Sequence, residues 1–355
     1  MSSDIVLREF DEDAFDSLFV GDFDAALNLS LVQDRLVWDF STRLGQGRIN
    51  GFRPAAPDNL QDITDFSTGP TLSLPLGNAT KLNLVGEVSA RQFDDASRAD
   101  NDSLLFLADL NRALSPTRSV GFSVSRRSVE FDDAQDSEFD FDSYFLTFAS
   151  VTTWGGMTAE FGFNSVEFAT DKSEGLRARL SVNRKIAAYS TLTVFAGQQL
   201  TDSGALLNQS SNGGVLARPD QIAAVNDALT RTNFGVTFSV ERPRSEFDVA
   251  FAWIDDEFET QGLNDIESYQ LSGGLRRRLT SRTSATVGGR FLRRDFAVAG
   301  ERNDEWRVNA GLNVELTSRF SVGFDYTRRR LHATNREDFS ENQYSIDFAW
   351  AISGS

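Results

Sequence analysis

Arginines at alternate positions are the chemically most suggestive feature of this 355-residue sequence. In a β-strand, residues two apart point to the same face, so the pairs Arg177–Arg179 and Arg276–Arg278 would each share one surface. Following this pleat, we expect twelve basic residues on a polar face. Four of them are Arg43, Arg91, Arg127 and Lys185, and the eight that we take as the candidate lining are Arg177, Arg179, Arg276, Arg278, Arg290, Arg294, Arg307 and Arg329. Where arginines line a pore, they favour anions. This surface is therefore a candidate selectivity lining.

Acidic residues fall on the same predicted face and offer another interpretation. They number nine, against twelve basic residues, and they are Asp39, Glu87, Asp109, Glu160, Glu241, Asp248, Glu315, Asp325 and Asp347. Arginines and carboxylates could simply pair across the wall and keep an interior wet. A register slip of one residue would move any of these side chains to the other face.

Enzymatic chemistry is not indicated. His332 is the only histidine, so any Ser-His-Asp arrangement would depend on it alone. Carboxylate pairs such as Asp132–Asp133 lie where no apolar pocket is predicted to raise a pKa. The chain has no Cys, and no loop has the residue order of a calcium hand. We expect no catalytic activity, no cofactor and no specific metal site.

The segments that carry the arginines read as strands. Trp306, Val308 and Ala310 alternate with Arg307 and Asn309, a period of two residues. No run of 18 apolar residues occurs, so no helical membrane span is expected. Strand alternation is found in residues 4–10, 25–31, 36–40, 72–76, 82–90, 104–111, 120–131, 139–150, 157–168, 176–185, 192–200, 234–240, 247–253, 269–278, 285–296, 306–316, 320–326 and 344–352.

Short turns and long loops alternate between these strands, as in outer-membrane barrels with short periplasmic turns and long extracellular loops. We predict one all-β domain over residues 1–355: a transmembrane, antiparallel, up-and-down β-barrel of eighteen strands with both termini periplasmic. Sixteen strands is the fallback if the turn at Gln33–Asp34 fails. Residues 45–69 and 201–229 are predicted as long loops, and Pro219 to Leu229 could form a helical turn folded inward as a constriction.

Charges and aromatic residues fit this polarity. The long loops are predicted to carry Asp132, Asp133, Asp136, Asp255, Asp256, Glu257, Glu259, Glu337 and Asp338, and the tight turns Arg118, Arg242, Arg244, Arg282 and Arg319. The acidic rim is either a solvated surface or a place where divalent cations bridge to anionic lipid or polymer. Trp154, Trp306, Tyr344 and Trp350 lie near strand ends, which favours an interfacial girdle over sugar stacking.

A barrel in the outer membrane must be exported, and its location limits the partners that we expect. Met1-Ser2-Ser3-Asp4 has no signal-peptide pattern, so we interpret the chain as a mature sequence with an added initiator Met; the alternative is a chain that is not exported. The net charge of −17 argues against nucleic acid. Expected partners are outer-membrane lipid and lipopolysaccharide, a polysaccharide or small solute, and periplasmic secretion proteins.

The stretch from Asp62 to Leu74 (DITDFSTGPTLSL), with Leu82 to Ala90 and Arg118 to Ser125, resembles a family of outer-membrane β-barrel porins associated with bacterial exopolysaccharide operons. The resemblance implies a conduit through which an exopolysaccharide crosses the outer membrane, working with periplasmic and inner-membrane synthesis proteins. The residues alone indicate a closed barrel with a charged lumen. Two other functions stay open: a general or solute-specific diffusion porin, and a barrel that acts as an adhesin or envelope scaffold without transport.

Overall fold

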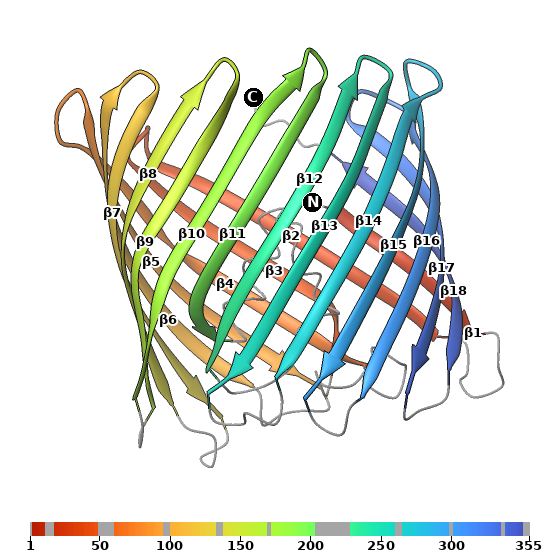
Figure 1. The fold of residues 1–355 in the computed structure, drawn as a ribbon, viewed down its shortest axis with the longest axis horizontal. Coiled ribbons are helices and arrows are strands. Elements are labelled where there is room, and N and C mark those ends of the chain that lie inside the picture. Colours follow the sequence, from red (N-terminus) through yellow and green to blue (C-terminus); the bar gives the residue numbers. More distant parts are fainter. Residues whose placement is uncertain are drawn as a thin grey trace.

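A computed structural model describes residues 2–10, 18–48, 60–94, 100–132, 138–168, 172–202, 228–259, 265–297, 301–334 and 338–350. These residues form one antiparallel sheet (Figure 1). None of them forms a helix long and apolar enough to cross a membrane. The strands are β1 (Ser2–Phe10), β2 (Leu18–Val32), β3 (Leu36–Arg48), β4 (Leu60–Pro75), β5 (Thr80–Phe93), β6 (Asn101–Ser115), β7 (Arg118–Phe131), β8 (Phe139–Thr152), β9 (Gly155–Phe168), β10 (Lys172–Ala187), β11 (Ser190–Asp202), β12 (Ala228–Arg242), β13 (Ser245–Phe258), β14 (Ile266–Arg278), β15 (Thr283–Phe296), β16 (Arg302–Glu315), β17 (Phe320–Ala333) and β18 (Phe339–Trp350).

The sheet has 18 strands, as predicted, and each pairs with its neighbours along the chain. β1 pairs with both β2 and β18, so the ladder returns to its first strand. Barrels of 16 to 18 strands enclose an aqueous channel rather than a packed core. The order of pairing therefore gives the chain a wall and a lumen.

The connections differ between the two ends of the barrel. At one end, two to four residues join consecutive strands, and we call this the short-turn end (Figure 1). The turn at Gln33–Asp34, on which the strand count depended, is confirmed: β2 ends at Val32, and Asp34 adopts a positive φ of 58°. β18 ends at the short-turn end, where Trp350 pairs with Phe320, and Ser2 pairs with the adjacent Ala349.

Two loop predictions were too long. In the predicted loop 45–69, residues 45–48 belong to β3 and residues 60–69 belong to β4, and the two strands pair from Arg48 and Leu60 onward. The ladder from β4 to β5 omits Gly69 and Pro70, because proline has no N–H to donate. The second predicted loop is shortened by Thr201 and Asp202 of β11 and by Ala228 and Leu229 of β12. The rest of the predicted helical turn, residues 219–227, lies outside the described residues.

Part of the predicted acidic rim also belongs to the wall. Asp255, Asp256 and Glu257 lie within β13 and pair with β12 or β14. The strands run beyond the apolar belt, and there the alternation of apolar residues that marks a strand in the sequence disappears. Asp133, Asp136 and Glu337 lie outside the described residues.

One face of the wall is an apolar belt. Large hydrophobic side chains at alternate positions are widely exposed, among them Phe106 (59%), Phe163 (62%) and Val308 (57%). Exposing one such side chain to water costs about 1.5–3 kcal/mol relative to burial. A continuous belt of them marks a surface that faces lipid.

Aromatic residues lie near both ends of this belt. Trp154, Tyr189 and Trp350 are exposed near the short-turn end, and Trp306 and Tyr344 are exposed toward the other end. Such a distribution is typical of the girdles at membrane interfaces. The belt and its two aromatic rims also fix the opposite face of every strand as the lumen.

Candidate functional site

The eight predicted arginines lie on the face opposite the apolar belt. Leu176 and Leu180, which alternate with Arg177 and Arg179 on β10, are exposed on the belt side. The same relation holds on β14, β15, β16 and β17, where exposed Leu275, Val287, Val308 and Phe324 belong to the opposite parity from the arginines. The structure separates the eight into three groups with different surroundings.

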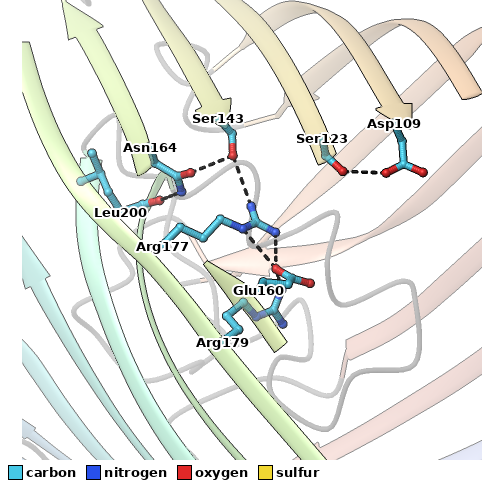
Figure 2. Close-up of polar contacts among 8 residues, drawn as sticks. All are labelled: Asp109, Ser123, Ser143, Glu160, Asn164, Arg177, Arg179 and Leu200. Carbon is cyan, nitrogen blue, oxygen red and sulfur yellow. Dashed lines mark hydrogen bonds and ion pairs between the residues drawn. The ribbon is translucent and has the colours of Figure 1, made fainter. Parts of the chain in front are cut away.

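The first group is built around Arg177. Its Nη2 and Nε donate to Oε2 of Glu160 on β9, at 2.7 and 3.1 Å (Figure 2). Its Nη1 donates to Ser143 Oγ on β8 at 3.4 Å, and its Cζ lies 3.7 Å from the centre of the Phe145 ring. These contacts from two neighbouring strands hold the guanidinium in one orientation, with only 16% of the side chain exposed.

Arg179 shares the carboxylate of Glu160. Its Nη1 lies 3.8 Å from Glu160 Oε2, and 42% of its side chain is exposed. Because one carboxylate serves two guanidinium groups, this part of the lumen wall carries an excess positive charge. Arg179 presents that charge to the lumen, whereas Arg177 is held against the wall.

The end of β11 leaves the wall beside this group. The ladder between β10 and β11 stops at Ala178 and Gln198, although both strands continue beyond it. From there β10 pairs only with β9, and β11 pairs only with β12. In Figure 1 the dark green end of β11 curves away from β10 accordingly.

A pair of hydrogen bonds holds the end of β11 inside. Asn164 on β9 donates through Nδ2 to the backbone oxygen of Leu200 at 2.6 Å, and its Oδ1 accepts from Ser143 Oγ at 2.7 Å (Figure 2). Ser143 also accepts from Arg177. The same polar chain therefore connects the arginine site with the inward end of β11.

Apolar packing also holds the end of β11 on the lumen side of the wall. By its parity Leu200 should face lipid, yet it is 1% exposed and packs in a cluster with Val129, Phe139 and Val166 of the wall. Gly175 on β10 provides the space, because a Cβ at this position would lie 2.7 Å from Leu200 Cβ. The outer face of β11 thus lies against the inner face of the neighbouring wall.

A contact between β10 and the end of β13 confirms the geometry. Ser173 Oγ donates to Glu259 Oε2 at 3.2 Å, and Glu259 Oε1 also accepts from Thr230 on β12. In a regular ladder, β10 and β13 would be three strand spacings, or about 14 Å, apart. We call residues 199–202 and 228–230 the inward tip, and it lies on the lumen side of the wall at the level of Arg177.

The second group of arginines is buried in the wall of β15 to β17. Arg290, Arg307 and Arg329 lie opposite one another in the ladder. Arg329 Nη2 is 2.9 Å from Glu305 and its Nη1 is 3.6 Å from Glu341, with 7% of the arginine side chain exposed. Arg294 on β15 is also buried. This group matches the pairing interpretation rather than a freely accessible lining.

The third group is Arg276 and Arg278 on β14, near the short-turn end. Both are exposed, and among the described residues neither has an ion pair within 4.0 Å. Their neighbour Arg277 points to the belt side, because it alternates with the lumen pair. These two arginines face the lumen as accessible cations.

Some members of the site were not predicted as such. Arg231 on β12 forms a two-armed ion pair with Asp256, with both N···O distances 2.6 Å, whereas Asp256 was expected in a loop. Asn164, Ser143 and Leu200 carried no sequence signal, because their roles depend on where β11 leaves the wall. In the described part of the chain, no group of three or more His, Cys, Asp or Glu side chains could hold a metal ion.

Solved structures of outer-membrane proteins have a similar fold. OccK9 (OpdG) of Pseudomonas aeruginosa aligns with a TM-score of 0.52 and 12% identity over 99% of this chain and 97% of that chain. OpdK of the same organism, in a complex with vanillate, aligns at 0.50 and 12% over 98% and 97%. The FrpB iron transporter of Neisseria meningitidis aligns at 0.51 and 9% over 98% and 80%. No family model and no curated protein sequence matches the chain.

The closed antiparallel ladder and the exposed apolar belt define the class of protein, a transmembrane β-barrel, and these outer-membrane proteins share its fold. More particularly, it has an 18-stranded wall and a charged lumen into which the inward tip projects.

Proposed function

We propose that this barrel is an outer-membrane channel that favours anions, with its long loops outside the cell, both termini in the periplasm and a charged exopolysaccharide as its exported cargo. The observation that carries the anion preference is the sharing of Glu160 by Arg177 and Arg179 at the level of the inward tip. A solute passing this part of the wall meets two guanidinium groups and one carboxylate. An oriented excess of cations in a narrow passage raises the local concentration of anions.

Arg276 and Arg278 extend the basic path toward the short-turn end. Their exposure allows direct contact with a carboxylate or phosphate, which arginine binds through two parallel N–H groups. A polymer leaving the periplasm would meet this pair first and the Arg179 level second. The exopolysaccharide itself rests on the resemblance of residues 62–132 to porins of exopolysaccharide operons, and periplasmic secretion partners follow from it.

A second candidate, a solute-specific diffusion porin, is favoured by the inward tip. A constriction suits a small solute better than a polymer chain. The neighbouring OpdK structure contains vanillate, an aromatic carboxylate, and its fold is the feature that the two proteins share. A small anion could use the same arginines, with the Phe145 ring beside Arg177 as an apolar contact.

Blocking experiments in planar bilayers separate the candidates. We expect hexagalacturonate, a linear anionic oligosaccharide, to interrupt the ion current at lower concentration than maltohexaose, a neutral chain of equal length. Block by galacturonate monomer and not by the hexamer would favour the small-solute porin. A channel that no anion interrupts more readily than a neutral sugar would contradict the anion path.

The arginines are tested in the same assay. Replacing Arg276 and Arg278 with Gln should weaken the block by hexagalacturonate and lower the anion preference. Arg277→Gln is the matched control, since it removes a charge from the same strand on the belt side. Equal effects of the lumen and control variants would remove Arg276 and Arg278 from the path.

A further inference from the structure

Strands β12, β13 and β14 lie side by side where they reach the short-turn end (Figure 1), and three of their residues form a row there. Arg242 of β12 lies opposite Ser245 of β13, and Ser245 lies opposite Arg277 of β14. Neighbouring strands are about 4.8 Å apart, so the Cα atoms of the two arginines are about 10 Å apart, with the serine between them. We call Arg242, Ser245 and Arg277 the outer arginine row.

The row borders the apolar belt. Two positions further from the short turns, Val240, Phe247 and Leu275 lie opposite one another on the same three strands. Phe247 and Leu275 are each 42% exposed and belong to the belt. Because residues two apart on a strand share a face, the outer arginine row points outward as well. Both of its arginines are exposed.

An aromatic residue marks the membrane level of the row. Tyr189, in the turn before β11, is 55% exposed, and its backbone oxygen accepts a hydrogen bond from the N–H of Glu241, the residue before Arg242, at 2.8 Å. Tyrosine and tryptophan gather where acyl chains give way to lipid headgroups. The outer arginine row is therefore at headgroup level, with the belt on one side and the short turns on the other.

No carboxylate of the described residues neutralises the row. Neither Arg242 nor Arg277 forms an ion pair or a side-chain hydrogen bond with them. The nearest acids along the chain, Glu241 and Glu246, alternate with the outward residues and so face the lumen. On the far side of β14, the row meets Ala285 of β15. The two guanidinium groups are therefore accessible to a ligand from the membrane.

The outer surface carries opposite charges at its two ends. On the described strands β6 to β14, the charged side chains that point outward near the short-turn end are all arginines: Arg112, Arg118, Arg184, Arg242 and Arg277. Toward the other end the outward carboxylates are Glu130, Asp140, Asp142, Glu167, Glu174, Asp255, Glu257 and Glu267. The basic residues among them, Arg126 and Lys172, form ion pairs. In a chain of net charge −17, the short-turn end is thus a local reversal of charge.

We propose that the outer arginine row binds the phosphate of an anionic phospholipid, with a headgroup that has no amine, in the leaflet at the short-turn end. Arg242 and Arg277 hold the phosphate oxygens with charge-assisted hydrogen bonds, and the Ser245 hydroxyl between them donates a further one. The acyl chains lie over Phe247 and Leu275. A headgroup ammonium is disfavoured, because no described carboxylate on this face lies beside the row to accept it. The site depends on the barrel fold and is independent of what the lumen transports.

Quenching of a fluorescent label by brominated lipids tests the site in a bilayer. The chain has no Cys, so Ala285→Cys, beside Arg277 in the ladder, can carry a single bimane label. The probes are dibrominated phosphatidylglycerol and dibrominated phosphatidylethanolamine with the same acyl chains. Phosphatidylglycerol should bind about 30-fold more tightly at this label, since each basic residue near anionic lipid contributes about a fivefold factor.

Two double variants in the labelled protein separate the row from net charge. R242Q/R277Q should remove the preference for phosphatidylglycerol. The control R276Q/R278Q removes two charges from the lumen side and should keep the preference. A label at Leu29→Cys, which is exposed on the belt of β2, a strand without arginine, should report a much smaller preference.

Four outcomes would overturn the proposal. Equal quenching by the two lipids at position 285 would show that acyl contact alone holds the lipid. Equal preference at positions 29 and 285, or equal loss in R242Q/R277Q and R276Q/R278Q, would assign the effect to the charge of the whole barrel. Loss of the preference in millimolar glycerol phosphate would show a site for a free anion. Since the readout is lipid binding, none of these results bears on whether the lumen conducts.

Discussion

Substitution of Leu200 by alanine tests whether the inward tip narrows the lumen. Leu200 is 1% exposed and packs on Val166 and over Gly175, so the change removes a buried methine and two buried methyl groups. Leu→Ala at a well-packed site costs about 2–5 kcal/mol. If that energy holds the tip against the wall, the ratio of docked to released tip falls by a factor of about 30 to several thousand.

Single-channel recording in planar bilayers measures the result. We expect L200A to show a larger mean conductance than the wild type and more frequent transitions between levels, because a released tip moves within the lumen. Leu271→Ala is the control, since Leu271 is 51% exposed on the apolar belt and the same atoms are lost without contact to the tip. Wild-type conductance and noise in a folded L200A barrel would refute the assignment of the tip as the constriction.

Two further predictions concern the wall. Gly235→Ala should lower the free energy of unfolding by about 1–3 kcal/mol, because the new Cβ would lie 2.2 Å from Cζ of Phe195. The loss should be smaller in the double variant G235A/F195A, and fully additive losses would contradict the contact. Arg329→Gln should destabilise the barrel by about 3–5 kcal/mol in urea titration, because Glu305 and Glu341 would remain buried as carboxylates. Exposed Arg276→Gln is its control, and equal midpoints for these two variants would show that the buried ion pairs contribute nothing.

The strands and their number could be predicted from the sequence because the belt imposes a strict period of two. Trp306, Val308 and Ala310 all face lipid, so they must be apolar, and they alternate in the sequence with the polar residues Arg307 and Asn309. Beyond the belt no face of a strand contacts lipid, so this requirement for alternating apolar residues ends. Residues 60–69 of β4 and Asp255 to Glu257 of β13 lack it and were predicted as loops for that reason.

The arginine site was predictable only in part. Pleat counting places Arg177, Arg179 and Glu160 on one face, and their contact follows from the ladder between β9 and β10. The distinction between accessible Arg276 and buried Arg329 depends on carboxylates from neighbouring strands, which the pleat alone does not reveal. The alternation of apolar and polar residues fails most clearly at Leu200. Its place in the alternation predicts a side chain that faces lipid, whereas the separation of β11 from β10 turns the side chain toward the lumen.

The reversal potential of the reconstituted wild-type channel under a tenfold KCl gradient tests the central claim most directly. An open lumen with excess arginine at its narrow level predicts a steady conductance and a reversal potential displaced toward the chloride equilibrium potential. A barrel that inserts but carries no current, or a displacement toward the potassium equilibrium potential, would contradict it.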